Sequence, residues 1–281
     1  MKNTSIWIVG SKAKIGRALV TLLKRNPEYR LLTTDREVDV TDLAAVTMMA
    51  DRNRPEIIIN CSAVAPADYC EEHEVEAYAV NALGARNLAI VSRKHNAKLI
   101  HISTDDVFCG VSQRAKNEFD VPTPDTVYGK SKYAGEQFIK NLNPKHLIIR
   151  SSWIYGEGGH KDYVAKVLEK GKAGEHFKAS IQNISSPTSA NAIAKFIIKL
   201  LHTEEYGIYH AAAEGITTRH HFAATILKMA GYDPSLAQPE YSHEGVVITS
   251  TLLRNLMMEL TGIHKMDEWE KELETYIKGL E

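Results

Sequence analysis

The stretch that decides the fold lies near the N-terminus, where residues 5–16 read SIWIVGSKAKIG. The apolar run Ser5–Val9 has the composition of a short strand and stops at Gly10. The segment Ile15–Leu23 then carries apolar residues at helical spacing. The loop Gly10–Gly16 therefore joins a strand to a helix N-terminus, where small residues let the backbone approach phosphates and unpaired N–H groups face them. This order predicts a dinucleotide site, although a bare tight turn would place glycines in the same way.

The rest of the first half alternates short apolar runs with longer amphipathic ones. The expected strands are Tyr29–Thr33, Glu56–Asn60, Lys98–Ser103 and His146–Arg150, and the expected helices are one opened by Thr41-Asp42, Val75–Val91 and Gly129–Lys140. Alternating strands and helices imply right-handed crossovers between parallel neighbours. A continuously apolar run such as Ile57–Ile59 fits a central strand that is covered on both faces. The pattern predicts an α/β fold with a doubly wound parallel sheet that is Rossmann-like.

The second half of the chain is less regular. Loops are expected at Gly156–Gly159 and Gly171–Gly174, helices at Ser189–Leu201, Thr217–Met229 and Asp267–Leu280, and a strand at Gly207–Ala211. No repeat, low-complexity tract or linker separates the two halves. We expect a dinucleotide-binding domain over residues 1–150 and a smaller, mostly substrate-binding lobe over residues 151–281, with some segments that return to the sheet. The active site should lie in the cleft between them.

Composition narrows the class of protein. The 281 residues include 34 Lys and Arg and 35 Asp and Glu, and this net charge of −1 gives no support to nucleic acid or membrane as a partner. A hydrophobic fraction of 44% and a charged fraction of 25% exclude disorder and coiled coil. Cys61, Cys70 and Cys109 are odd in number and form no C-x-x-C motif, which predicts reduced thiols and a cytoplasmic protein. We expect neither a signal peptide nor a spanning helix.

The cofactor is indicated by the end of the second strand, where Asp35-Arg36 follows the glycine loop by about 20 residues. A carboxylate there can bind both ribose hydroxyls of NAD, whereas an arginine can hold the 2′-phosphate of NADP. A surface ion pair is a further reading of the same two residues. Lys12 and Lys14 could assist an extra phosphate or simply be solvated. Ala13, the middle small residue of the loop, puts a methyl group where phosphates approach closely.

The reaction is indicated by a tyrosine and a lysine, Tyr128 and Lys132, which the four-residue spacing puts on one helix face. A neighbouring ammonium stabilises a phenolate and so lowers the pKa of a phenol. Thr104 ends the fourth expected strand, at the edge of the sheet where α/β proteins bind ligands. Two donors aimed at a carbonyl oxygen stabilise the negative charge that grows there during reduction of a ketone.

Together these motifs resemble the extended short-chain dehydrogenase/reductase superfamily, and within it the dTDP-4-dehydrorhamnose reductase family. The resemblance runs from about residue 5 to about residue 230, and it rests on the glycine loop, Asn60–Ala63, Asn81, Gly84, Asn87-Leu88, Ile100–Asp105, Tyr128–Lys132, Arg150–Gly156, Ser186–Thr188 and Gly207–His210. It implies reduction of a 4-keto group on a nucleotide-linked deoxysugar by NADPH (or NADH), in the biosynthesis of cell-surface polysaccharide. The implied partner is the nucleotide sugar alone, and the resemblance leaves room for a homodimer.

The resemblance also implies site residues. Tyr128 would protonate the sugar oxygen, Lys132 would lower the pKa of Tyr128 and bind the nicotinamide ribose, and Thr104 would hydrogen-bond the carbonyl. The cofactor-binding set comprises Gly10, Ser11, Lys12, Ala13, Lys14, Ile15, Gly16, Asp35, Arg36, Asp39, Val40, Cys61, Ser62, Ala63, Asn81, Tyr128 and Lys132. The substrate-binding set comprises Asp68, Thr104, Asp105, Asp106 and Trp153.

Several of these assignments keep a structural alternative. Asp68 and Asp105 could be loop caps, Trp153 could pack in the core instead of stacking on a sugar, and Cys61 reads as a buried small residue rather than a nucleophile. Adjacent histidines in Arg219-His220-His221 point to different helix faces, so no metal is expected.

Some positions depart from the family pattern. The family usually has glycine at Ala13, tyrosine at Asp106, Asp-Gln-x-Gly at Gln182–Ser185, and a late Arg-Pro pair where this chain has Val246–Ile248. These departures leave two alternatives open. One is a cofactor-binding regulatory homologue without turnover, a role that the related regulatory subunit of methionine adenosyltransferase illustrates. The other is a sugar-nucleotide 4,6-dehydratase, in which Asp105-Asp106 would be the acid–base pair.

Overall fold

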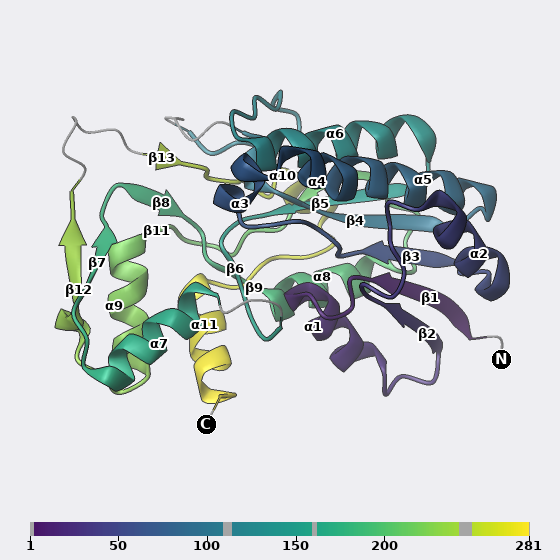
Figure 1. The fold of residues 1–281 in the computed structure, drawn as a ribbon. Coiled ribbons are helices and arrows are strands. Elements are labelled where there is room, and N and C mark those ends of the chain that lie inside the picture. The colour runs from purple at the N-terminus through teal and green to yellow at the C-terminus, as the bar shows by residue number, and fades with distance from the viewer. Residues whose placement is uncertain (1–2, 109–113, 159–161, 242–248, 281) are drawn as a thin grey trace.

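The computed structural model describes residues 3–108, 114–158, 162–241 and 249–280. Its centre is a parallel sheet of strand order β10-β5-β4-β3-β1-β2 (Figure 1). These strands are β1 (Thr4–Val9), β2 (Tyr29–Thr34), β3 (Ile57–Asn60), β4 (Lys98–Thr104), β5 (His146–Ser151) and β10 (Gly207–His210). The chain reverses its direction of winding between β1 and β3, and such a switch point is where open α/β sheets bind ligands. The predicted α/β fold with a doubly wound parallel sheet is confirmed.

Helices cover the sheet on both faces. One face carries α1 (Lys14–Leu23) and α8 (Ala190–Leu200), and the other carries α2 (Leu43–Asn53), α5 (Ala85–Lys94) and α6 (Val127–Leu142) (Figure 1). Successive residues of a strand enter different cores: Ile57 and Ile59 pack with α8, whereas Ile58 packs with α5. This double burial explains why strands such as β3 carry a continuous apolar run, Ile57–Ile59.

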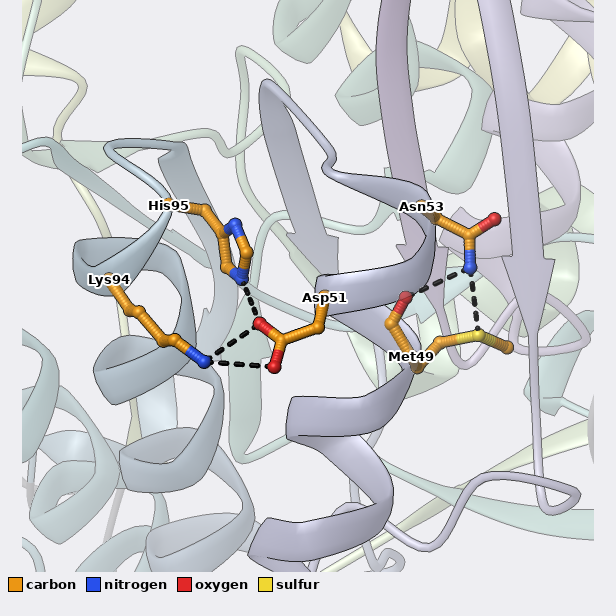
Figure 2. Close-up of polar contacts among 5 residues, drawn as sticks. All are labelled: Met49, Asp51, Asn53, Lys94 and His95. Carbon is orange, nitrogen blue, oxygen red and sulfur yellow. Dashed lines mark hydrogen bonds and ion pairs between the residues drawn. The ribbon is translucent and has the colours of Figure 1, made fainter.

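A polar contact ties α2 to the end of α5. The Lys94 ammonium lies 2.8 and 2.9 Å from the two carboxylate oxygens of Asp51, and His95 Nε2 lies 2.8 Å from one of them (Figure 2). At the end of α2, Asn53 Nδ2 donates to the Met49 carbonyl at 2.9 Å (Figure 2). The ion pair is solvent-exposed, so water screens it and it contributes little to stability.

The expected single helix Val75–Val91 is wrong in one respect. The chain forms α4 (Glu74–Tyr78), a π-helical turn (Ala79–Gly84) and then α5. The π turn contains Asn81, whose side chain binds both backbone polar groups of Val64. An inserted residue in a helix leaves no periodic signal in the sequence, and such turns are frequent at functional sites.

The expected loop at Gly171–Gly174 is also wrong. The helix α7 (Tyr163–Ala173) runs through Gly171, and only Gly174 leaves the helix, with φ +65°. Gly171 is buried, and a Cβ at this position would lie 2.6 Å from both Leu227 and Tyr232. Its glycine permits close helix packing rather than a turn.

The remaining elements form a smaller lobe whose core includes Tyr155, Phe222 and Trp269. They are α9 (Arg219–Met229), α11 (Trp269–Lys278), α7, and short strands that pair as β6 (Ile154–Tyr155) with β9 (Thr188–Ser189), β7 (Phe177–Ser180) with β12 (Ala237–Glu240), and β8 (Asn183–Ser185) with β11 (Thr217–Thr218) and β13 (Thr249–Ser250). Four short helical segments complete the described elements: α3 (Ala67–Glu72), α10 (Leu256–Thr261) and the 3-10 turns Asp105–Val107 and Pro234–Leu236.

Several elements expected from the sequence can be compared with this arrangement. The predicted helices and strand of the second half are present as α8, α9, α11 and β10, with ends shifted by one or two residues, and β10 joins the main sheet beside β5. A domain boundary at residue 150 stays a prediction. Cys109, Gly159 and Val246–Ile248 lie outside the described residues. Among those that are described, no helix is both long enough and apolar enough to cross a bilayer.

Candidate active site

The glycine loop brings backbone against backbone. A Cβ at Gly10, which has φ +72°, would lie 2.6 Å from the Ser62 nitrogen, and one at Gly16 would lie 2.3 Å from the Gly10 oxygen. Ala13 stands at the N-cap of α1 without a side-chain cap, and the first turn of α1 holds no acidic residue. The first N–H groups of the helix are therefore available to an anion. The shape of the loop fits a dinucleotide pyrophosphate.

Other predicted loop residues differ in what they expose. Ser11 donates its N–H to the Thr34 carbonyl at 2.9 Å, which fixes the loop beside the end of β2. The Ile15 side chain is buried in the core under α8, so only its backbone can face a cofactor. Lys14 begins α1 and is partly exposed, as is Ala13.

The residues after β2 form a charged rim. The Lys12 ammonium lies 3.8 Å from the Asp35 carboxylate, and Arg36 beside them is exposed. The ion pair that the sequence left as an alternative is thus present, but with Lys12 as the partner. Asp39 accepts hydrogen bonds from the N–H and hydroxyl of Thr41, both at 2.8 Å, so its carboxylate stabilises a turn. The Val40 side chain is buried in the sheet core.

The segment after β3 lies next to the loop. Cys61 is buried, and burial raises the pKa of its thiol to about 12, which fits the prediction of a small core residue rather than a nucleophile. Ser62 donates its N–H and hydroxyl to Asn60 Oδ1 at 3.0 and 2.6 Å. Ala63 is exposed, and Asn81 fixes the next residue, Val64, from the π turn.

The structure brings Thr104, Tyr128 and Lys132 to the carboxyl edge of the sheet. Thr104 ends β4, and Tyr128 lies in the first turn of α6, which Thr126 caps through the Gly129 N–H at 3.0 Å. A Cβ at Gly129 would lie 2.1 Å from the Asp106 carbonyl oxygen. Glycine at this position lets α6 rest directly on the turn after β4.

The electrostatics of these residues keep Tyr128 protonated. The expected lowering of the Tyr128 pKa by Lys132 is wrong, because burial and then the Asp106 and Asp105 carboxylates raise that pKa above its ordinary value. Lys132 is buried and donates to the Ile102 carbonyl at 2.6 Å. Burial lowers the pKa of Lys132 to about 8, although Glu136 opposes this.

Two carboxylates share the hydroxyl of Thr104. Thr104 Oγ1 lies 3.2 Å from Asp105 Oδ1 and 3.0 Å from Asp106 Oδ2, and Thr251 donates to Asp105 Oδ2 at 2.5 Å. Burial and then the neighbouring Asp106 charge raise the pKa of Asp105, and burial raises that of Asp106. Together the two carboxyl groups hold a proton more readily than isolated aspartates do.

A cavity of about 270 Å³ opens beside these carboxylates. Its lining residues come from both parts of the chain: Asp106, Phe108, Asp125, Thr126, Trp153, Asn183, Ile184, Arg219 and Thr251. The Arg219 guanidinium carbon lies 3.4 Å from the centre of the Trp153 ring and 4.8 Å from that of Tyr163. Arg219 therefore covers one face of Trp153.

Comparison with known proteins agrees with this geometry. The RmlD substrate binding domain family matches residues 4–281. The chain belongs to this family. A dTDP-4-dehydrorhamnose reductase of Aggregatibacter actinomycetemcomitans is 34% identical over 240 residues, 83% of this chain and 80% of that protein. The spore coat polysaccharide biosynthesis protein SpsK of Bacillus subtilis (strain 168) is 30% identical over 278 residues, 98% of this chain and 97% of that protein.

A solved relative extends the match to three dimensions. The dTDP-4-dehydrorhamnose reductase of Bacillus anthracis str. Ames, crystallised in complex with NADP, has a TM-score of 0.93 and 34% identity, with 99% of this chain and 100% of that chain covered. Membership in the RmlD family thus covers the whole described structure, including the small lobe.

Two positions that depart from the family pattern line the cavity, Asp106 and, from β8, Asn183. Ala13, a third departure, lies instead in the glycine loop. Arg219 was missed by sequence reasoning, which considered it only beside two histidines. Those histidines pack elsewhere: His220 Nε2 lies 3.1 Å from the Ala237 carbonyl oxygen, and the His221 ring meets the edge of Trp269.

Two further expectations concern ligands. Asp68 is exposed in the first turn of α3 and does not line the cavity. Among the described residues, no group of three or more His, Cys, Asp or Glu side chains is arranged to hold a metal ion.

Proposed function

We propose that this chain reduces the 4-keto group of a nucleotide-linked deoxysugar with NADPH or NADH, in the biosynthesis of cell-surface polysaccharide. The observation that carries the proposal is that Thr104, Tyr128 and Lys132 lie at the carboxyl edge of the sheet, the edge that also holds the glycine loop. Relatives at 34% identity that are named dTDP-4-dehydrorhamnose reductases support the same reaction.

The cofactor is held by the glycine loop and the rim after β2. The cradle at Gly10 and Gly16, which a Cβ would fill, receives the pyrophosphate over the uncapped N-terminus of α1. We prefer NADPH, because Lys12 offsets the Asp35 charge and leaves the exposed Arg36 to meet a 2′-phosphate. When bound, the nicotinamide supplies the hydride.

Tyr128 and Thr104 act on the oxygen of the ketone. As negative charge develops on that oxygen, Tyr128 transfers its proton to it, which completes the alcohol and leaves a phenolate. The Lys132 ammonium, one helical turn away, stabilises the phenolate. Thr104 turns its hydroxyl from the carboxylates to the same oxygen and donates a hydrogen bond.

The sugar occupies the cavity beside Asp106. Because Asp106 and Asp125 both line it, the substrate should offer a hydroxyl or amine donor to that wall, where an aromatic residue would offer a stacking surface. Trp153 contributes only the face that Arg219 leaves uncovered. We further propose a cytoplasmic location, consistent with the buried free thiols of Cys61 and Cys70. A homodimer stays a prediction, which sedimentation analysis tests.

One observation favours a second candidate, a 4,6-dehydratase. The pair Asp105-Asp106 lies within hydrogen-bonding distance of Thr104, and one of the two holds its proton readily, as an acid in water elimination must. A dehydratase returns its hydride and consumes no NADPH overall, whereas a reductase consumes one per turnover. Measuring NADPH loss beside water loss from the sugar therefore separates the two.

The direct test is Tyr128→Phe. Reductase turnover should fall by about 10² to 10⁴, the value of a positioned acid, while NADPH affinity measured by calorimetry stays nearly unchanged. Tyr29→Phe is a matched control, since it removes a hydroxyl that contacts His202 at the start of β2, away from the carboxyl edge of the sheet. Full activity in Tyr128→Phe would refute the proposed mechanism, and failure of the wild type to bind NAD(H) or NADP(H) would refute the function.

A further inference from the structure

Beneath Lys132 lies an imidazole whose role the mechanism above does not use. His101 is a fully buried residue of β4, between Asn60 of β3 and Lys132 of α6. His101 Nδ1 lies 3.0 Å from Asn60 Nδ2, and His101 Nε2 lies 3.4 Å from Lys132 Nζ. Each ring nitrogen thus faces a nitrogen of a neighbouring side chain.

The orientation of the Asn60 amide is fixed by its other contacts. Asn60 Oδ1 accepts from the Ser62 N–H at 3.0 Å and from the Ser62 hydroxyl at 2.6 Å. A backbone N–H can only donate, so a flipped amide would set two donors against each other. The Asn60 NH₂ group must therefore face His101 and donate to Nδ1.

That donation fixes the tautomer of the ring. A neutral imidazole accepts at one nitrogen and donates at the other, so acceptance at Nδ1 leaves the proton of His101 on Nε2. Burial and the Lys132 charge lower the pKa of His101 well below its usual value, so the ring is neutral. The Nε2–H then points at Lys132 Nζ, which also donates to the Ile102 carbonyl.

An N–H directed at an ammonium is repulsive, whereas the same N–H directed at a neutral amine is a hydrogen bond. We propose that Asn60 and His101 form a positioning unit for Lys132, in which the imidazole Nε2–H favours the neutral amine over the ammonium. The proposal rests on the proposed function only in giving Lys132 a part in turnover.

Two other titratable groups near Lys132 bear on whether it is charged. Glu136, one turn further along α6, favours the ammonium, but it is already paired with Arg150 and Ser103. The Cys61 thiol beyond β3 keeps its proton and carries no charge at neutral pH. His101 is thus the group on the β4 side that opposes Glu136.

The first experiment reads the tautomer without any turnover. In protein labelled with ¹⁵N-histidine, long-range ¹H–¹⁵N spectra distinguish a protonated ring nitrogen from a bare one, and His101→Gln assigns the resonance among the 12 histidines. We expect Nε2 to be protonated and Nδ1 bare, without titration between pH 5 and pH 9. Protonation on Nδ1, or a ring that titrates in this range, overturns the proposal even if the enzyme proves inactive on every sugar tested.

The second experiment reads the effect on Lys132 through the pH profile of kcat. Asn60→Asp replaces the amide donor by a carboxylate acceptor, so the ring proton of His101 should move to Nδ1. The alkaline fall of kcat should then shift to higher pH by at least about one unit. His101→Leu should also shift the alkaline fall of kcat to higher pH. His101→Gln should keep it near the wild-type position, because Gln can accept from Asn60 and still donate to Lys132.

The matched control is His202→Gln, which alters a histidine that contacts Tyr29 away from the site. Its pH profile should equal that of the wild type. If His101→Gln and His101→Leu shift the alkaline limb equally, His101 is only a packing residue and the proposal is wrong. A profile that no His101 variant moves leads to the same conclusion.

Discussion

The buried ion pair behind the active site should govern both stability and the charge of Lys132. Arg150 donates to Glu136 through Nε at 2.9 Å and Nη2 at 2.6 Å, and Ser103 donates to the same carboxylate at 2.6 Å. The side chains of Glu136 and Arg150 are 0% and 1% exposed. If one partner is removed, water cannot solvate the charge that remains.

Glu136→Gln keeps the shape of the side chain and removes its charge. The Arg150 guanidinium then stays buried without a counter-ion, which costs about 3 to 5 kcal/mol of unfolding free energy. For a chain of this size that corresponds to a fall in Tm of about 6 to 10 °C. The variant also loses the charge that supports the Lys132 ammonium, so the alkaline limb of activity should move to lower pH.

Urea unfolding at pH 7 measures the free energies, with Arg150→Met and the double variant completing a cycle. The double variant should lose less than the two single variants together, since it leaves neither charge alone. Glu274→Gln is the control, because its pair with Lys278 is exposed and should change stability by less than about 1 kcal/mol. Additive losses in the cycle would falsify the coupling on which this reasoning depends.

Three further changes test other parts of the fold. Because the pKa of Asp105 is raised in the folded state, that state binds the proton more tightly, and the stability from this group is lost as pH rises. Asp105→Asn should therefore raise Tm more at pH 8 than at pH 5, as a thermal-shift assay measures. Lys98→Met should cost about 1 to 3 kcal/mol in urea unfolding, because the Lys98 ammonium donates to three carbonyls at the end of α8, and a wild-type stability would show that water replaces it. Gly171→Ala should cost about 1 to 3 kcal/mol, since its Cβ would overlap Leu227 and Tyr232, and an unchanged midpoint would mean that α9 moves away freely.

The large sheet could be predicted because its signals are local. The central strands carry apolar residues that two cores bury, and β3 does so in one continuous run. Asp42 caps α2 through the N–H groups of Ala44 and Ala45, as its position before an apolar segment suggests. The motif residues Thr104 and Tyr128 could be placed at the same edge for a similar reason, since parallel strands all end there.

The short strands of the small lobe could not be predicted, because they pair across long separations in the sequence. Ile154 pairs with Thr188, and Phe177 with Ala237, so neither strand has a periodic pattern long enough to recognise. Arg219 was missed for a related reason. Its neighbours in the sequence are histidines, whereas its partners in space are the rings of Trp153 and Tyr163.

The two signs of charge at the site act at different stages of one proton transfer. Before transfer, burial and the carboxylates at Asp105 and Asp106 keep the proton on Tyr128. After transfer the same carboxylates would oppose a phenolate, and the Lys132 ammonium is the group that offsets them. Lys132 can do so only while it is charged, and Glu136 and His101 act on that charge in opposite directions. The buried residues behind the helix therefore limit the pH range in which the tyrosine can serve as an acid.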